Sequence, residues 1–139
     1  MQTALRASPE KIPDAIEEIL RVHGPLVANR RVTTCPVQIG GRDIAAGERL
    51  SLNWISANRD EGVFDDPYTV RLDRDQSQNL LYGVGIHACP GAPLARLEMR
   101  IALEELLGRT QQVVCNPDMS PALLIFPASG FATLPLIVS

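Results

Sequence analysis

Residues 81–96 read LYGVGIHACPGAPLAR, a loop rich in glycine and proline that surrounds one cysteine and leads into a helical segment. Gly83, Gly85 and Gly91 carry no Cβ, so the backbone beside Cys89 can fold tightly and approach a bound group closely. A cysteine just before a helix start lies where unpaired N–H groups and the helix dipole favour the thiolate. The stretch therefore predicts a single soft metal ligand that leaves the other positions of the metal to ligands from elsewhere.

Eight residues of this stretch follow a fixed spacing. They are Tyr82, Gly85, His87, Cys89, Gly91, Leu94, Ala95 and Arg96. The spacing resembles the cysteine-ligand loop of the cytochrome P-450 family, haem-thiolate monooxygenases that usually have phenylalanine at the position of Tyr82. The resemblance implies an α+β fold in which the Cys89 thiolate is the axial ligand of haem iron and pushes electron density toward bound oxygen.

The resemblance also implies which other residues bind the haem. His87 occupies the position that hydrogen-bonds a haem propionate in the family, and Arg31 occupies the position of a further propionate ligand. The expected cofactor-binding set is completed by Tyr82, Gly85, Gly91 and Ala95. Without the surrounding pattern, a lone histidine near a cysteine and an arginine in a strand would indicate structural or exposed side chains.

Composition and charge place the 139 residues in one domain without a nucleic-acid or membrane surface. The net charge is −3 and the 13 basic residues are scattered, which argues against nucleic acid as a partner. No apolar run reaches the roughly 20 residues of a membrane span, and the first six residues lack the apolar core of a signal peptide. Three cysteines at unrelated spacings favour a reducing cytoplasm over a disulfide framework, and Cys35 and Cys115 are expected to be small hydrophobic residues within strands.

A helix is predicted from Pro13-Asp14 to Arg21 or Val22, since proline suits a first helical turn and Gly24-Pro25 ends the pattern. Glu18 and Arg21 lie one turn apart, close enough to pair. Their context resembles helix K of the family, which carries a Glu-x-x-Arg pair. The resemblance implies that the pair is structural and locks the loop beneath the haem.

Residues 26–55 are predicted to form sheet, with turns at 40–43 and 46–47 and an alternating strand over 50–54. Their spacing resembles the hairpin region after helix K of the family. The resemblance implies that Arg31 is the propionate ligand, with its neighbour Arg30 as the alternative. Residues 56–60 are predicted to form a short capped helix or turn. The irregular residues 61–80 resemble the family's meander, where an arginine often contacts the Glu-x-x-Arg pair. This chain has Thr69 at that position, so either Arg71 or Arg74 is left to replace it.

After the loop, residues 92–107 are predicted to form a mostly buried helix ended by Gly108, because apolar residues cover most of its circumference. Short strands are expected over 112–115, 122–126 and 134–138. The predicted order is helix K, β hairpins, meander, cysteine-ligand loop, helix L and C-terminal strands, in one unit over 1–139. The N-terminal helical part of the family fold has no counterpart in this order.

Other site patterns fit less well. Residues 83–88 match the dinucleotide pattern Gly-x-Gly-x-x-Ala, but Pro90 and Pro93 stand where its helix should be under way. A zinc site needs four nitrogen or sulfur ligands, and only His87 lies near Cys89 in the sequence. A cysteine nucleophile would need a base and an orienting group that this loop does not offer.

The resemblance covers only about the C-terminal third of the family's usual length, which leaves two functional interpretations. The chain is either the haem-thiolate portion of a bacterial-type monooxygenase, or a truncated, non-catalytic haem-binding or interaction protein. The first would oxidise a small organic substrate with electrons from a ferredoxin or flavoprotein. Arg96 and Arg100 are candidate docking residues for that donor, although a salt-bridged helix face explains them equally well. Apolar surface on residues 92–107 is expected to cause self-association or binding of an N-terminal partner chain.

Overall fold

The computed structural model describes all 139 residues and has the mixed composition of helices and strands expected of an α+β chain. The helices are α1 (Gln2–Ala7), α2 (Ile12–Val22), α3 (Trp54–Ala57) and α4 (Ala92–Arg109), with 3₁₀ turns η1 (Pro9–Lys11) and η2 (Gly85–His87). The strands are β1 (Ala28–Val32), β2 (Val37–Ile39), β3 (Arg42–Ile44), β4 (Arg49–Asn53), β5 (Val113–Cys115), β6 (Ala122–Leu123), β7 (Phe131–Thr133) and β8 (Leu136–Val138).

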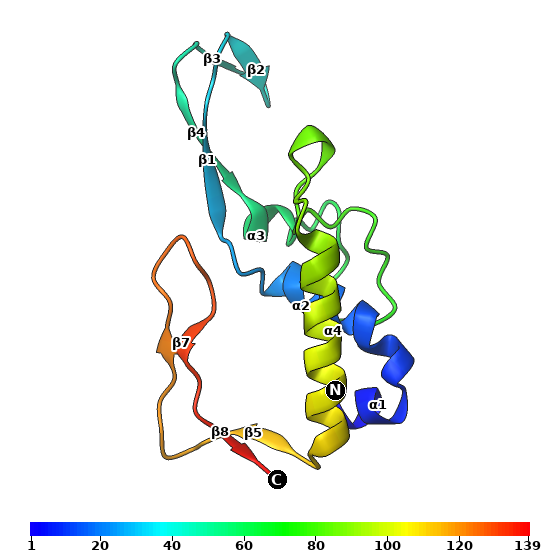
Figure 1. Cartoon of the computed structure of the whole chain (residues 1–139). Coiled ribbons are helices and arrows are strands. Elements are labelled where there is room, and N and C mark those ends of the chain that lie inside the picture. Colours follow the sequence, from blue (N-terminus) through cyan, green and yellow to red (C-terminus); the bar gives the residue numbers. More distant parts are fainter.

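The long helix α4 is the axis of the molecule, with α2 and α1 packed against it (Figure 1). The core lies between these three helices. It consists of Leu5, Ile12, Ala15, Ile16 and Leu107. Helix α2 begins within one residue of the predicted start, with Pro13 in its first turn where the missing N–H leaves no intrahelical bond unmade.

Helix α1 was not predicted, and it changes where α4 ends. The Arg6 guanidinium donates hydrogen bonds to the carbonyl oxygens of Leu107 and Thr110, and the Thr110 hydroxyl donates to the Leu106 carbonyl at 2.6 Å. These side chains satisfy the free carbonyls of the last turn. The prediction that Gly108 ends the helix is therefore wrong, since α4 continues through this glycine to Arg109.

The first half of the sheet structure is a long hairpin that carries a second hairpin at its tip (Figure 1). Strands β1 and β4 are antiparallel, with Arg31 opposite Leu50, and β2 pairs with β3. The predicted turn over 40–43 is shorter, because its second half belongs to β3. Trp54 leaves the predicted strand and begins α3, where the Asn53 side chain accepts a hydrogen bond from the Ser56 N–H at 3.1 Å.

The C-terminal residues form an arm of two more antiparallel pairs, β5 with β8 and β6 with β7 (Figure 1). Strand β7 was not predicted. The tip of the arm returns to the end of α2: the Val27 N–H donates to the Pro127 carbonyl at 2.9 Å, and the Ser129 N–H donates to the Pro25 carbonyl at 2.8 Å. The tip of the arm is therefore hydrogen-bonded to the linker between α2 and β1.

The folded chain exposes an unusual amount of surface. Its accessible area is 9766 Å², whereas a compact monomer of 15.1 kDa exposes about 7,100 Å². Only Ala92 and Leu107 of helix α4 are buried, and Leu94 is 59% exposed. The prediction of a mostly buried α4 is therefore wrong for this chain, although the predicted exposure of apolar residues on 92–107 is observed.

The predicted strand position of Cys115 is confirmed, since it is the last residue of β5, whereas the prediction for Cys35 is wrong, because it lies in the bend after β1. Both cysteines are exposed. None of the helices combines the length and the continuous apolar character that are needed to cross a bilayer.

Candidate functional site

A cavity of about 460 Å³ lies between the cysteine loop, the N-terminal half of α4, the end of α2 and the β1–β4 hairpin. Five of the seven residues expected to bind haem line it: Arg31, Tyr82, His87, Cys89 and Ala95. The Cys89 thiol is exposed at this wall. The remaining lining residues are Leu20, Pro25, Leu26, Asn29, Trp54, Leu81, Gly83, Glu98 and Met99.

The glycines determine the backbone conformation of the cysteine loop. Gly83 and Gly85 have positive φ angles of 71° and 66°, a region that side chains other than glycine rarely enter. A Cβ on Gly83 would lie 3.2 Å from the His87 carbonyl oxygen. The Cys89 N–H donates to the Tyr82 carbonyl at 2.7 Å. The loop therefore closes on itself, and this closure turns the cysteine and the histidine toward the same cavity.

Gly85 and Gly91 are the two expected residues that do not line the cavity. A Cβ on Gly91 would come within 3.8 Å of the Cys89 sulfur, which is ordinary contact. Gly91 immediately precedes α4, with Pro93 in the first helical turn. Its position keeps the space beside the sulfur open at the start of the helix.

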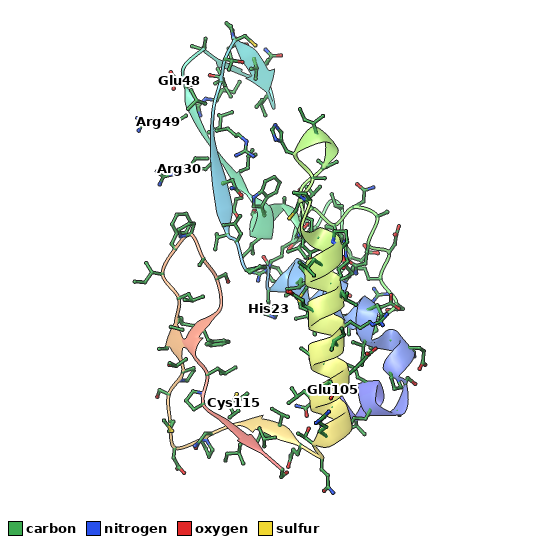
Figure 2. All side chains as sticks on the ribbon, viewed as in Figure 1. His23, Arg30, Glu48, Arg49, Glu105 and Cys115 are labelled. Atoms are coloured by element: carbon green, nitrogen blue, oxygen red, sulfur yellow. The ribbon has the colours of Figure 1, made fainter.

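Arg31, rather than Arg30, is the arginine on the cavity side of the β1–β4 hairpin. Successive residues of a strand point to opposite faces, and Figure 2 shows Arg30 and Arg49 on the side facing away from the cysteine loop. Arg31 is held by one hydrogen bond, from its Nη1 to the Arg30 carbonyl at 2.9 Å. Most of its guanidinium donors are therefore available to an anionic group in the cavity.

Trp54 and Asn29 are lining residues that the sequence analysis missed. The Trp54 Nε1 donates to the Asn29 Oδ1 at 2.6 Å, and this bond fixes the indole ring against the cavity. The only signal in the sequence was the alternation of apolar residues over 50–54, which ends on the single tryptophan of the chain. Alternation indicates a half-buried face but does not say what covers that face.

Arg96 is held by two neighbours close to the cysteine loop. Its guanidinium lies 4.5 Å above the centre of the Tyr82 ring, and its Nε is 2.5 Å from the Glu17 Oε1. Burial raises the pKa of the Tyr82 hydroxyl, and the nearby Glu17 carboxylate adds to the effect. Arg100 lies 3.3 Å from Glu104 on the same helix. Both candidate docking residues therefore take part in ion pairs within the chain.

Glu18 and Arg21 form a fully buried ion pair beside the loop. The Arg21 Nε and Nη2 donate to the two Glu18 carboxylate oxygens at 2.8 and 2.9 Å, and both side chains are 0% exposed. The Arg21 guanidinium also donates to the Asn58 carbonyl at 2.5 Å and lies 4.8 Å from the centre of the Phe64 ring. The pair thus connects α2 with residues more than thirty positions later.

Arg74, rather than Arg71, provides the second arginine of this cluster. The Arg74 Nε donates to the Glu18 Oε1 at 2.8 Å, and the Gln76 Nε2 donates to the Glu18 Oε2 at 2.9 Å. Arg71 contributes only its backbone N–H, at 3.1 Å, while its side chain pairs with Asp73 at the surface. The arginine absent at Thr69 is therefore replaced by a residue five positions later.

These contacts determine the charge state of Glu18. Burial by itself would raise the pKa of the carboxyl, but the hydrogen bonds from Arg21, Gln76 and Arg74 outweigh it and lower the pKa from 4.5 to about 2. Each of these donors favours the ionised form. Glu18 is therefore a carboxylate at neutral pH and has no proton to exchange, as expected of a structural group.

Exchanging each of the two arginines for methionine is expected to separate their contributions to stability. Arg74→Met removes a nearly buried donor from Glu18 and should lower the free energy of unfolding by about 2–3 kcal/mol. Arg71→Met is the matched control, because it removes an exposed pair worth about 0–1 kcal/mol and leaves the backbone N–H in place. Urea unfolding at pH 7 measures both. Equal losses would contradict the assignment of Arg74.

The protein side chains at the site do not form a metal-binding cluster by themselves. No group of three or more histidine, cysteine, aspartate or glutamate side chains is arranged to hold a metal ion. A cavity with one thiol, two cationic or neutral nitrogen donors in Arg31 and His87, and apolar walls fits a metal carried by an organic macrocycle with acidic substituents.

Comparisons with known proteins all point to the same family. A family model described as cytochrome P-450 matches residues 12–136. The cyclomarin C epoxidase CymV of Salinispora arenicola is 46% identical over 108 residues, 78% of this chain and 27% of that protein. The methyl-branched lipid omega-hydroxylase of Mycobacterium tuberculosis is 42% identical over 125 residues, 89% of this chain and 29% of that protein. The chain spans less than a third of the length of these two relatives.

Solved structures of the same family superpose on nearly the whole chain. Ligand-free cytochrome P-450 TbtJ1 has a TM-score of 0.93 and 38% identity, and the match covers 99% of this chain and 36% of that one. Substrate-free CYP150A6 of Mycobacterium marinum has a TM-score of 0.94 and 33% identity, with the same coverage. The predicted C-terminal part of the family fold is thereby confirmed. From the cysteine-loop spacing to the superposition, all observations agree that this chain belongs to the cytochrome P-450 family.

Proposed function

We propose that this chain binds haem through the Cys89 thiolate and forms the sulfur-ligand side of a monooxygenase site. The observation that carries the proposal is that Arg31 of β1 meets Cys89 and His87 of the cysteine loop, more than fifty residues later in the chain, at one cavity. A thiolate and two nitrogen donors around apolar walls match a macrocycle with a central iron and acidic substituents at its edge.

The roles of the residues follow from their chemistry. Cys89 would supply the sulfur ligand of the iron, and Arg31 and His87 would donate hydrogen bonds to the propionates. Tyr82 and Ala95, together with Leu81 and Met99, would form the apolar wall against the macrocycle. Gly85 and Gly91 keep the loop backbone close to the cofactor. Bound in this way, haem supplies the oxygen chemistry that inserts one oxygen atom into an organic substrate.

The substrate and the electron donor belong to the assembled protein. One relative is called an epoxidase and another a lipid hydroxylase, so we propose oxygen insertion into a small organic molecule without choosing between these substrate classes. A ferredoxin or flavoprotein would deliver the electrons. Arg96 and Arg100 are weaker candidates for the docking site than they were from the sequence, because carboxylates of the same chain already pair with them.

Haem binding is tested by supplying the chain with haem, reducing it and adding carbon monoxide. The parent chain is expected to give the Soret band of a thiolate-ligated ferrous carbonyl complex, and Cys89→Ser is expected to lose this band completely. Cys115→Ser is the matched control, since this cysteine lies on the β5 strand, away from the cysteine loop (Figure 2). A parent spectrum that Cys89→Ser leaves unchanged would refute the proposal.

A second candidate function is assembly without catalysis, favoured by the exposed surface of the chain. The area above that of a compact monomer is roughly 2,700 Å², whereas each partner buries about 800 Å² in an interface of standard size. We therefore expect the isolated chain to self-associate or to bind a partner chain. Sedimentation velocity should show species heavier than 15.1 kDa. A compact, soluble monomer across micromolar concentrations would contradict this expectation.

A further inference from the structure

We propose that Asn58 and Asn79 form a hydrogen-bonded bridge between the Glu18–Arg21 pair and the cysteine loop, which makes them positioning residues for Cys89. The inference rests on the proposed haem site, and it goes beyond it by naming how the buried pair determines where the loop lies. Neither asparagine lines the cavity, so both would act through the backbone of the residues that do.

Asn58 uses its backbone carbonyl and both polar atoms of its side chain in this bridge. It is 2% exposed, and its carbonyl accepts the hydrogen bond from Arg21 at 2.5 Å. Its side-chain Oδ1 accepts from the Leu80 N–H at 2.7 Å, and its Nδ2 donates to the Asn79 Oδ1 at 2.9 Å. One residue thus touches both the buried arginine and the start of the cysteine loop.

Asn79 makes the parallel connection. Its Oδ1 also accepts from the Leu81 N–H at 3.0 Å. Its Nδ2 donates to the Gln76 Oε1 at 3.0 Å and to the Glu17 carbonyl at 3.3 Å. Since Gln76 in turn donates to Glu18, Asn79 connects the loop to the carboxylate end of the pair, while Asn58 connects it to the guanidinium end.

The bridge ends at Leu81, one residue before Tyr82, whose carbonyl is bonded to the Cys89 backbone. Asn58 and Asn79 hold the N–H groups of Leu80 and Leu81, and the next residue, Tyr82, accepts the hydrogen bond from the Cys89 N–H at 2.7 Å. The Leu80 carbonyl also accepts from the Gly83 N–H at 3.0 Å. Fixing the backbone at 80–81 therefore also fixes the Tyr82 carbonyl, which is the hydrogen-bond acceptor of the Cys89 N–H.

Asparagine is the residue that this arrangement requires, because a donor and an acceptor are needed at the end of one short side chain. Aspartate at position 58 would keep the acceptor for Leu80 but would place a negative charge against the Asn79 Oδ1. Alanine would leave the Leu80 N–H without this acceptor in a part-buried place. No buried side-chain nitrogen or oxygen of the chain lacks a hydrogen-bond partner.

The first test uses hydrogen exchange on the haem-free chain. Asn58→Ala and Asn79→Ala are each expected to speed exchange of the Leu80, Leu81 and Cys89 amides by about tenfold or more. Asn116→Ala is the chemically matched control, since it removes a similar side-chain contact, from the Asp118 N–H at 2.9 Å, in the C-terminal arm away from the cavity. Leu5→Ala is the stability control, because it destabilises the core at the far end of α2.

The second test uses the haem-supplied chain. Asn58→Ala and Asn79→Ala should lower the fraction of the ferrous carbonyl complex that shows the thiolate-type Soret band, while both controls retain the parental fraction. The loss in the double variant should be smaller than the sum of the two single losses, because the two asparagine side chains are hydrogen-bonded to each other.

The inference is overturned if Leu5→Ala speeds exchange at the three amides as much as Asn58→Ala, or if Asn58→Ala leaves the Cys89 amide unchanged. If the parent chain gives no thiolate-type band at all, the proposed haem function fails. The exchange experiment still decides whether the bridge exists, because it needs no haem.

Discussion

Glu18→Gln is expected to lower the free energy of unfolding by about 3–5 kcal/mol, the loss that follows removal of one partner of a buried ion pair. In the variant, Arg21 remains charged and 0% exposed. Its partner is then a neutral amide, which has one hydrogen-bond-accepting oxygen where the carboxylate had two. Arg74 and Gln76 donate to different oxygens of the carboxylate, so one of these two donors also loses its acceptor when an amide nitrogen replaces an oxygen. Urea unfolding at pH 7, followed by far-ultraviolet circular dichroism, measures the change. The fraction of the chain that binds haem should fall together with the free energy of unfolding.

Glu17→Gln is the control for this variant, because it makes the same chemical change one residue away. Glu17 pairs with Arg96 at the surface, where the two side chains are 19% and 47% exposed. Exposed pairs contribute about 0–1 kcal/mol. If both glutamine variants unfold at the same urea concentration, the buried cluster is not the source of stability that its geometry indicates.

Lowering the pH should remove the stabilising contribution of the Glu18 carboxylate from the parent chain. The pKa of Glu18 is about 2 in the folded chain against 4.5 as its ordinary value, which corresponds to about 3 kcal/mol. Since the folded pKa is the lower one, this stability is fully present above pH 4.5 and is lost as the pH falls toward 2. Lowering the pH in this window should therefore destabilise the parent chain.

The comparison with Glu18→Gln isolates this effect from that of other carboxylates. Exposed Asp73 and Asp75 also have lowered pKa values, because Arg71 and Ser77 donate hydrogen bonds to them. Their contributions cancel when the two proteins are compared at each pH. The stability difference between parent and variant should shrink steadily from pH 5 to pH 2. A difference that stays constant over this range would contradict the assigned pKa.

Elements with local causes were predictable. The helix containing Glu18 and Arg21 follows from proline in the first turn and apolar spacing, and both residues fall on one face because they are one turn apart. The tight loop around Cys89 follows from glycines that adopt positive φ angles. Family resemblance added the cofactor and the pairing of Arg31 with the cavity, which spacing alone does not give.

Elements that depend on distant partners were not predictable. Arg71 and Arg74 were equivalent candidates in the sequence, and only the path of the meander brings the Arg74 guanidinium to Glu18. Gly108 failed to end α4 because Arg6, about a hundred residues earlier, supplies the cap. Asn58 gave no signal of its bridging contacts, since its partners at Leu80 and Asn79 lie more than twenty positions away.

The candidate metal ligand and the pairing of Glu18 with Arg21 were thus readable from residues 12–22 and 81–96, because each depends on neighbours within one turn or one loop, whereas the structural role of the pair was implied only by the family resemblance. Which side chains surround that ligand, which arginine completes the cluster and how much of α4 is exposed depend on contacts between segments far apart in the chain. Such contacts are set by how whole elements pack, and pairs of distant residues carry no periodic pattern that a single sequence displays.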